Sequence, residues 1–132
     1  MVVGATDPAE LGPLPENVDA RPWFPQLTVL ARASGFITHA GMGSTMEALH
    51  HGVPMLALPQ MPEQAVNADR LVELGLGRRL DPDSLSAGAL RRAVEEVTSD
   101  RTVRSGLDHM RAHIREAGGA ASGADAIEEH LG

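Results

Sequence analysis

A chain of 132 residues, with 42% hydrophobic and 22% charged residues, is long and apolar enough to bury a core, which excludes a disordered segment. It contains neither cysteine nor lysine, which excludes disulfide bonds, thiolate metal sites and lysine-based catalysis. The net charge of −7 and the scattered arginines argue against a nucleic-acid partner. No apolar run approaches the roughly 18 residues of a membrane span and no signal peptide is evident, so we expect a cytoplasmic protein.

Short strands and helices alternate along the amino-terminal part of the chain. Residues 2–3 predict the remnant of a strand, and residues 17–21 predict a brief second strand. Residues 26–33 have helical composition, and residues 35–38 are typical of a buried strand. Because the pattern begins on a strand remnant with no strand–helix unit before it, we expect the chain to be the later part of a larger domain.

The same alternation continues through the middle of the chain. Residues 44–51 predict a helix that ends at Gly52, and residues 54–58 predict an apolar strand. The next helix is expected to begin at Pro62 and to end at Gly75. The side chains of this helix that we expect to be buried are Ala65, Ala68, Leu71, Val72 and Leu74.

The last part of the chain predicts one short strand followed by helices. Residues 76–80 form the strand, and the helical remainder has breaks near residues 99–100 and 118–119. Strands and helices that alternate with short connections predict an α/β fold, in which helices cover both faces of a parallel sheet. Such sheets bind ligands at the carboxyl ends of their strands.

The turn after the predicted strand at residues 35–38 contains the first candidate site. Two glycines, Gly41 and Gly43, let the backbone turn tightly before a helix predicted to begin at Ser44. Free amide groups and the positive dipole end of a helix form a site for a diphosphate, and His39 can donate one more hydrogen bond. A capping box formed by Ser44 and Glu47 would explain those two residues without any ligand.

Two further candidates lie on either side of this turn. Trp23 lies between two prolines, where its ring can stack on a base, although a lone tryptophan is more often a core residue. Glu63 and Gln64 fall in the first turn of a predicted helix, at the same sheet edge as His39. They can bind sugar hydroxyls, although Glu63 equally favours a helix amino terminus by its charge alone.

The sequence does not predict a metal site. His109 and His113 have the i, i+4 spacing of two ligands on one helix face, but no carboxylate completes a metalloprotease pattern, which favours an exposed polar face. Backbone amides and His39 can stabilise a departing diphosphate without a cation. We therefore expect no metal and no cofactor.

Four spaced motifs together resemble the donor-binding signature of family 1 glycosyltransferases. These are the GT-B enzymes that include plant secondary-product and bacterial macrolide glycosyltransferases. The signature's Trp-x-Pro-Gln matches residues 23–26, and its Phe-x-Thr-His-x-Gly-x-x-Ser-x-x-Glu matches residues 36–47. Its Gly-Val-Pro-Met and Gln-x-x-Asn segments match residues 52–55 and 64–67. The resemblance covers most of the chain and is densest over residues 17–74.

For the nucleoside, the resemblance implies four residues. Trp23 would stack on the base, and the backbone of Phe24 would contact the edge of the base. Gln26 and Glu47 would hold the ribose hydroxyls.

For the diphosphate and the sugar, the resemblance implies the remaining contacts. His39 and the backbone at residues 43–45 would bind the phosphates, and Glu63 and Gln64 would face the sugar. The full set of residues predicted to bind the nucleotide sugar is Trp23, Phe24, Gln26, His39, Gly41, Gly43, Ser44, Thr45, Glu47, Glu63 and Gln64.

Two positions depart from the family's pattern. Met42 and Gly43 stand where plant members have Trp-Asn, so backbone would replace one side-chain contact to phosphate. Glu63 stands where aspartate is usual, so the identity of the sugar is open.

For the whole protein, the resemblance implies a Rossmann-like sheet in the carboxyl-terminal domain of a GT-B enzyme. Residues 1–132 would be a single, partial donor-binding domain, with the acceptor domain and the catalytic base absent. The complete enzyme would be inverting, transferring a hexose or deoxyhexose from a UDP- or TDP-sugar to a small hydrophobic natural product. Two alternatives are a non-catalytic nucleotide-sugar-binding partner subunit and a UDP-sugar epimerase of the same fold.

Overall fold

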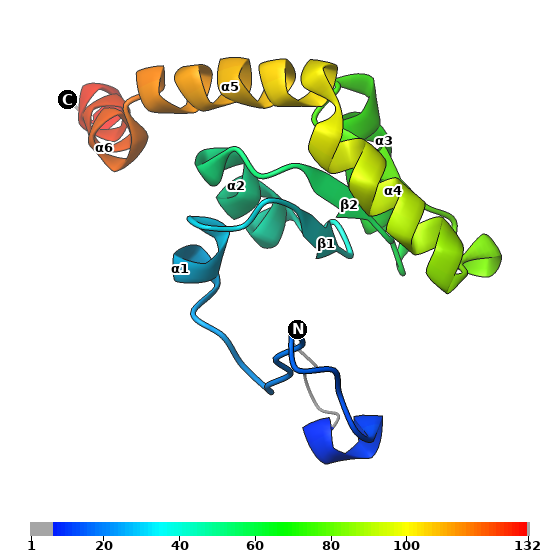
Figure 1. Ribbon diagram of the computed structural model, residues 1–132. Coiled ribbons are helices and arrows are strands. Elements are labelled where there is room, and N and C mark those ends of the chain that lie inside the picture. Colours follow the sequence, from blue (N-terminus) through cyan, green and yellow to red (C-terminus); the bar gives the residue numbers. More distant parts are fainter. Residues whose placement is uncertain (1–6, 132) are drawn as a thin grey trace. The chain divides into compact units, whose positions relative to one another are not determined.

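The computed structural model describes residues 7–131 (Figure 1). The strand remnant predicted at residues 2–3 lies outside the described residues. The chain divides into two compact units, residues 1–32 and residues 33–132, and each is described by itself.

The first unit contains a short 3-10 helix η1 (Pro8–Leu11) and the helix α1 (Gln26–Leu30). The helix predicted over residues 26–33 is thus confirmed, with an earlier end. The strand predicted over residues 17–21 is wrong, because these residues form a turn and irregular backbone that ends in one isolated bridge at Arg21. Residues 17–19 are all exposed, so a strand here would have no apolar face to bury.

The second unit is built on a parallel sheet of three strands, as predicted. The strands are β1 (Phe36–Thr38), β2 (Met55–Ala57) and β3 (Gly77–Arg79), in the spatial order β1-β2-β3. All three residues of β2 are buried. Since successive side chains point to opposite faces of a sheet, both faces of the central strand are covered.

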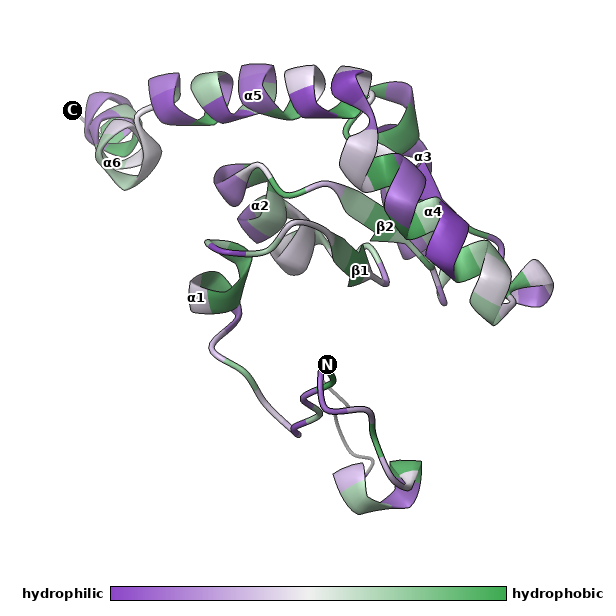
Figure 2. Cartoon of the chain, in the orientation of Figure 1, coloured by the Kyte–Doolittle hydropathy of each residue, from purple (hydrophilic) through white to green (hydrophobic). Residues whose placement is uncertain are grey.

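Helices connect the strands and cover the sheet. Helix α2 (Met42–His51) packs against β1, α3 (Pro62–Glu73) packs against β3, and α4 (Ala87–Ser99) contacts both β2 and β3. Figure 2 shows apolar residues along the strands and polar ones on the outer side of α5 (Arg101–Glu116), which also packs on α2. The remaining elements of this unit are the short 3-10 helix η2 (Pro82–Ser84) and the helix α6 (Gly119–Leu131).

Glycine and proline end and begin the helices where the sequence predicts. Helix α2 is followed by Gly52 with a φ of 67°, and α3 begins at Pro62. Gly75, just after α3, also has a φ of 67°. A positive φ is accessible to glycine at little cost, and it turns the chain out of the helix.

The predicted buried face of α3 is correct only in part. Ala68 and Leu71 are buried, but Val72 is 47% exposed and Leu74 is 41% exposed. The buried face instead includes Gln64, which is 8% exposed. Residues 64, 68 and 71 repeat at helical spacing, and Val72 is rotated by about 100° from Leu71.

One arginine of β3 fixes the junction between α4 and α5. Arg78 Nη1 donates to Glu96 at 2.7 Å, and Arg78 Nη2 donates to Asp100 at 3.2 Å. Asp100 also caps α5 by accepting a hydrogen bond from the Thr102 amide at 2.8 Å. The Thr102 amide and the Arg78 guanidinium lower the pKa of the Asp100 carboxyl below its usual value.

Candidate functional site

The carboxyl ends of β1 and β2 lie together at one edge of the sheet. The Leu58 amide donates to the Thr38 carbonyl at 2.8 Å, which joins the residues that leave the two strands. The turn at residues 39–41 leads from β1 into α2, and residues 58–61 lead from β2 into α3. The structure therefore brings the predicted phosphate-binding turn and the start of α3 to the same edge.

The turn itself contains an unusual backbone conformation at Ala40. This residue has a φ of 64°, although it is not a glycine, and it is completely buried. A left-handed conformation costs an alanine about 1–2 kcal/mol. Its amide donates to Thr38 Oγ1 at 3.1 Å, and its carbonyl accepts a hydrogen bond from Asn67 Nδ2 at 3.0 Å.

The histidine of the turn lies against the following glycine. A Cβ built on Gly41 would be 2.5 Å from His39 Nε2, which is closer than real Cβ contacts. The backbone of Gly41 is extended, with a φ of −65°, so a larger residue here would displace the imidazole without straining the backbone. The imidazole of His39 is exposed at this position and can reach a ligand.

Helix α2 begins at Met42, two residues before the predicted start. Gly41 is its N-cap, and the Thr45 amide makes the first helical bond, to the Gly41 carbonyl at 3.0 Å. Ser44 is therefore the third helical residue and cannot be the N-cap of the predicted capping box, which is wrong. The helix begins earlier because the extended backbone of Gly41 already supplies the first carbonyl acceptor.

Two features at this helix start suit an anionic ligand. Apart from its chain neighbours and the backbone of its own helix, no part of the described chain comes within 4 Å of a Cβ built on Gly43, so the space beside its backbone is open. The Thr45 side chain is buried, and its hydroxyl has no hydrogen-bond partner among the residues that the structure describes. Amides at a helix start have no partner within the helix, so this turn offers donors to phosphate oxygens, and the buried Thr45 hydroxyl is a further polar group there that needs a partner.

Glu63 and Gln64 differ in burial and in hydrogen bonding. Glu63 is exposed in the first turn of α3, whereas Gln64 is buried and its Oε1 accepts a hydrogen bond from the Gln60 amide at 2.9 Å. Gln64 therefore fixes the loop from β2, a role that the motif did not suggest. Its Nε2 is the part of the amide that this bond leaves for a ligand.

The predicted base-binding residues belong to the first unit. The Trp23 side chain is 72% exposed, so Trp23 is not a core residue of this unit. Phe24 is half-buried, and the guanidinium carbon of Arg21 lies 5.4 Å from the centre of its ring. Gln26 is the first residue of α1.

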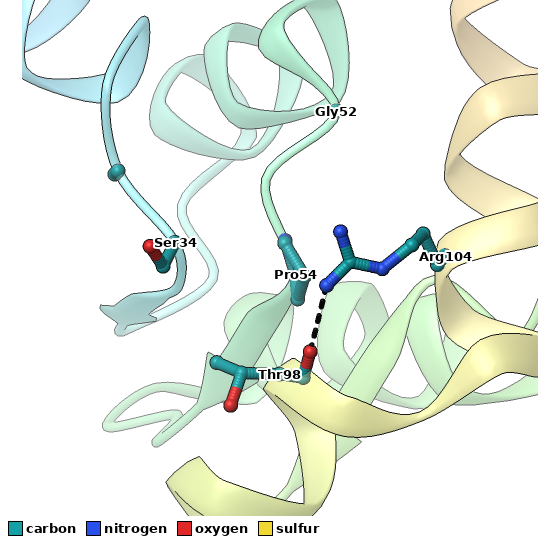
Figure 3. A pocket seen from close by; sticks show the side chains of 6 residues that line it. Ser34, Gly52, Pro54, Thr98 and Arg104 are labelled. Atoms are coloured by element: carbon teal, nitrogen blue, oxygen red, sulfur yellow. Dashed lines mark hydrogen bonds between the residues drawn. The ribbon is translucent and has the colours of Figure 1, made fainter.

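A cavity of about 230 Å³ lies at the other edge of the sheet (Figure 3). Two of its residues, Ser34 and Pro54, come just before β1 and β2. Arg104 Nη2 donates to the Thr98 carbonyl at 2.9 Å and so satisfies the carboxyl end of α4. None of the predicted site residues lines this cavity, whose residues are Ala33, Ser34, Gly52, Pro54, Thr98 and Arg104.

The remaining polar clusters have structural explanations. Asp81 and Asp83 form an Asp-x-Asp pattern that the sequence analysis missed, but Asp81 Oδ1 accepts the Asp83 amide at 3.0 Å and caps η2. His109 and His113 have ring centres 4.4 Å apart and are exposed. Across residues 7–131, no three histidine, aspartate or glutamate side chains are grouped to hold a metal ion.

Within residues 7–131, every helix is too short or too polar to cross a membrane.

The comparisons with known proteins agree with this fold. A family described as erythromycin biosynthesis protein CIII-like, C-terminal domain, matches residues 1–122. The NDP-glycosyltransferase YjiC of Bacillus licheniformis is 48% identical over 132 residues, covering 99% of this chain and 33% of its own length.

Two solved structures show the same fold. The calicheamicin glycosyltransferase CalG4 superposes with a TM-score of 0.92 at 43% identity, covering 97% of this chain and 34% of that one. The glycosyltransferase VinC, solved in complex with DTDP, has a TM-score of 0.73 at 25% identity, covering 79% of this chain and 26% of that one. The chain thus spans about a quarter to a third of the length of these relatives.

Fold and comparisons together define a Rossmann-like α/β domain, the carboxyl-terminal domain of GT-B glycosyltransferases. The chain belongs to the family of EryCIII-like carboxyl-terminal domains, whose name refers to an erythromycin biosynthesis protein. The predicted fold class and the predicted family are therefore confirmed.

Proposed function

We propose that this chain is the donor-binding part of an inverting glycosyltransferase and binds the diphosphate of a nucleotide sugar at the amino end of α2. The observation that carries this proposal is that three features lie at the start of α2: the exposed His39, the open space beside the Gly43 backbone, and the buried Thr45 hydroxyl, which has no hydrogen-bond partner within the described residues. Amide groups at a helix start, together with the helix dipole, favour a bound anion. In the transfer reaction, the same donors would stabilise the charge that develops on the departing diphosphate.

For the rest of the donor, we assign the contacts that the resemblance implies. Trp23 stacks on the base, the Phe24 backbone contacts the edge of the base, and Gln26 and Glu47 hold the ribose. The exposed ring of Trp23 supports this assignment, because it is available for stacking.

The sugar is assigned to the amino end of α3. Glu63 is exposed there, and Gln64 keeps its Nε2 for a hydroxyl group. A UDP- or TDP-sugar fits these contacts, and the DTDP complex of a related glycosyltransferase supports a thymidine nucleotide.

The acceptor and the catalytic base are assigned to another part of the complete protein. Relatives named for erythromycin and calicheamicin support a small hydrophobic natural product as the acceptor. An acceptor hydroxyl, deprotonated by a base in an amino-terminal domain, would attack the anomeric carbon as the diphosphate leaves. A reaction without metal or cofactor, in the cytoplasm, stays a prediction.

Of the two alternatives, the glycosyltransferase names of the relatives argue against an epimerase. A partner subunit that completes an enzyme on another chain would use the same donor site. Adding a separate amino-terminal domain to a transfer assay tests that alternative.

The donor site is tested by titrating the chain with UDP and with TDP while following its backbone amide signals by NMR. We expect shifts at residues 23–26, 39–47 and 63–64, because these segments hold the proposed contacts. AMP serves as a control for binding that does not depend on a pyrimidine. Shifts confined to α5 and α6, or the same shifts at the same concentrations of AMP, would contradict the donor assignment.

A further inference from the structure

We propose that Asn67 is a positioning residue for the phosphate-binding turn, because its side chain holds Ala40 in the left-handed conformation that places His39 and the start of α2. This inference rests on the proposed function of the turn. Asn67 does not belong to the residues assigned to the ligand, and its side chain donates a hydrogen bond to the protein backbone, at the Ala40 carbonyl.

The first step is the conformation of Ala40. Its φ of 64° is disfavoured for any residue with a Cβ, so the free turn would leave this conformation unless its surroundings hold it. The residue is completely buried, so water cannot bind its amide and carbonyl groups. Both groups must therefore be satisfied by the protein, or the conformation would cost still more.

The second step is which groups satisfy Ala40. Side chains supply both partners: the Thr38 hydroxyl accepts a hydrogen bond from the Ala40 amide at 3.1 Å, and Asn67 Nδ2 donates one to the Ala40 carbonyl at 3.0 Å. Thr38 is two residues away and moves with the turn. Asn67 is 27 residues away, so its hydrogen bond connects the turn to α3, a separate element of the fold.

The third step is which groups the hydrogen bond from Asn67 to Ala40 positions. Ala40 lies between His39 and Gly41, so rotation of its backbone would move the imidazole and the N-cap of α2 together. Helix α3 carries Glu63 and Gln64 at its start and Asn67 one turn further on. The hydrogen bond from Asn67 therefore sets the distance between the proposed sugar contacts and the proposed phosphate contacts.

The experiment compares Asn67→Ala and the isosteric Asn67→Asp, neither of which donates a hydrogen bond near neutral pH. Val66→Ala is the matched control, because Val66 is the preceding residue of α3 and is 68% exposed. Two quantities are measured in the 132-residue chain: the amide chemical shifts of residues 39–43 without ligand, and the dissociation constant for UDP.

We expect both Asn67 variants to move the amide signals of residues 39–43 and to raise the dissociation constant about tenfold, since one hydrogen bond is lost. Val66→Ala should change neither quantity. In an Ala40→Gly background, Asn67→Ala should raise the dissociation constant less than threefold, because glycine adopts a positive φ without the same cost. Such coupling would not follow from a general loss of stability.

Unchanged amide signals in a folded Asn67→Ala or Asn67→Asp chain would overturn the inference. The inference would also be overturned if Asn67→Ala raised the dissociation constant equally with alanine and with glycine at residue 40. If both Asn67 variants unfold, recovery of the fold by Ala40→Gly supports the inference, and lack of recovery overturns it. If the unmodified chain binds neither UDP nor TDP, the proposed function fails, and the amide signals without ligand alone decide the role of Asn67.

Discussion

The ring of His39 lies so close to Gly41 that a methyl group on the glycine would be 2.5 Å from His39 Nε2. The imidazole thus occupies space, after the carboxyl end of β1, that the side chain of any larger residue at position 41 would need. Two residues later, apart from the chain neighbours of Gly43, no side chain of residues 7–131 comes as near as 4 Å to a Cβ built on that glycine. The two glycines of one turn therefore have different roles, and the same substitution should affect them differently.

Gly41→Ala should weaken the binding of UDP because the added methyl displaces the His39 ring. The expected loss is about 1.5–3 kcal/mol, the scale of one hydrogen bond to a charged group. Isothermal titration calorimetry of the variant and of His39→Ala would test this. We expect the two single variants to lose similar amounts of binding free energy, and the double variant to lose little more. Additive losses in the double variant would contradict the shared mechanism.

Gly43→Ala should stabilise the fold and yet weaken nucleotide binding. The free structure has room for the methyl, and alanine favours a helix by about 0.5–1 kcal/mol over glycine. The same methyl would occupy the space assigned to a phosphate oxygen. Urea unfolding measures the stability of the variant, and calorimetry measures its affinity for UDP. A stabilised variant that binds UDP as well as the original chain does would show that Gly43 is not part of the site.

Trp23→Ala should weaken UDP binding by about 1–3 kcal/mol and leave the free energy of unfolding nearly unchanged. The first effect is the scale of stacking between a base and an aromatic ring. The second follows because the side chain is 72% exposed. Trp23 is the only tryptophan in the chain, so its fluorescence reports the site directly. Binding without any change in that fluorescence would place the base elsewhere.

Acid should remove the stabilisation that Asp100 provides. The pKa of Asp100 is lowered in the folded chain, chiefly by the hydrogen bond from the Thr102 amide and then by Arg78. Its ionised form therefore stabilises the fold above the ordinary carboxyl pKa of about 3.9, and this contribution is lost as the pH falls through the lowered value. Asp100→Asn should be less stable than the original chain at pH 7, and the difference should shrink towards pH 3. Urea unfolding at several pH values measures this; a difference that stays constant would contradict it.

The chain by itself should bind a nucleotide sugar and transfer no sugar. Transfer requires a base within reach of the acceptor hydroxyl as well as stabilisation of the leaving group, and only the second is assigned to these residues. A second domain would also exclude water from the site. Incubation with UDP- and TDP-sugars and with phenolic and macrolide acceptors tests this. Repeated turnover to a glycoside without added protein would show that the base lies within this chain.

The sequence by itself determined the three strands of the sheet, the helices between them and the family. The signals for these elements are local: apolar runs mark the strands, and the helix boundaries are marked by Gly52, Pro62 and Gly75. Each of these signals affects only the conformation of the few residues around it, so it can be recognised in the sequence. The motifs likewise predicted that His39 and the start of α3 share one edge, because parallel strands place their carboxyl ends together.

What only the tertiary structure decided depends on contacts between distant residues. Ala40 adopts a left-handed conformation with Asn67 on its carbonyl, and no local signal marks either the conformation or its distant partner. The burial of Gln64 and the exposure of Val72 depend on which face of α3 meets the sheet. Local propensity sets where elements begin and end, whereas the satisfaction of buried polar groups is decided by whatever packs beside them.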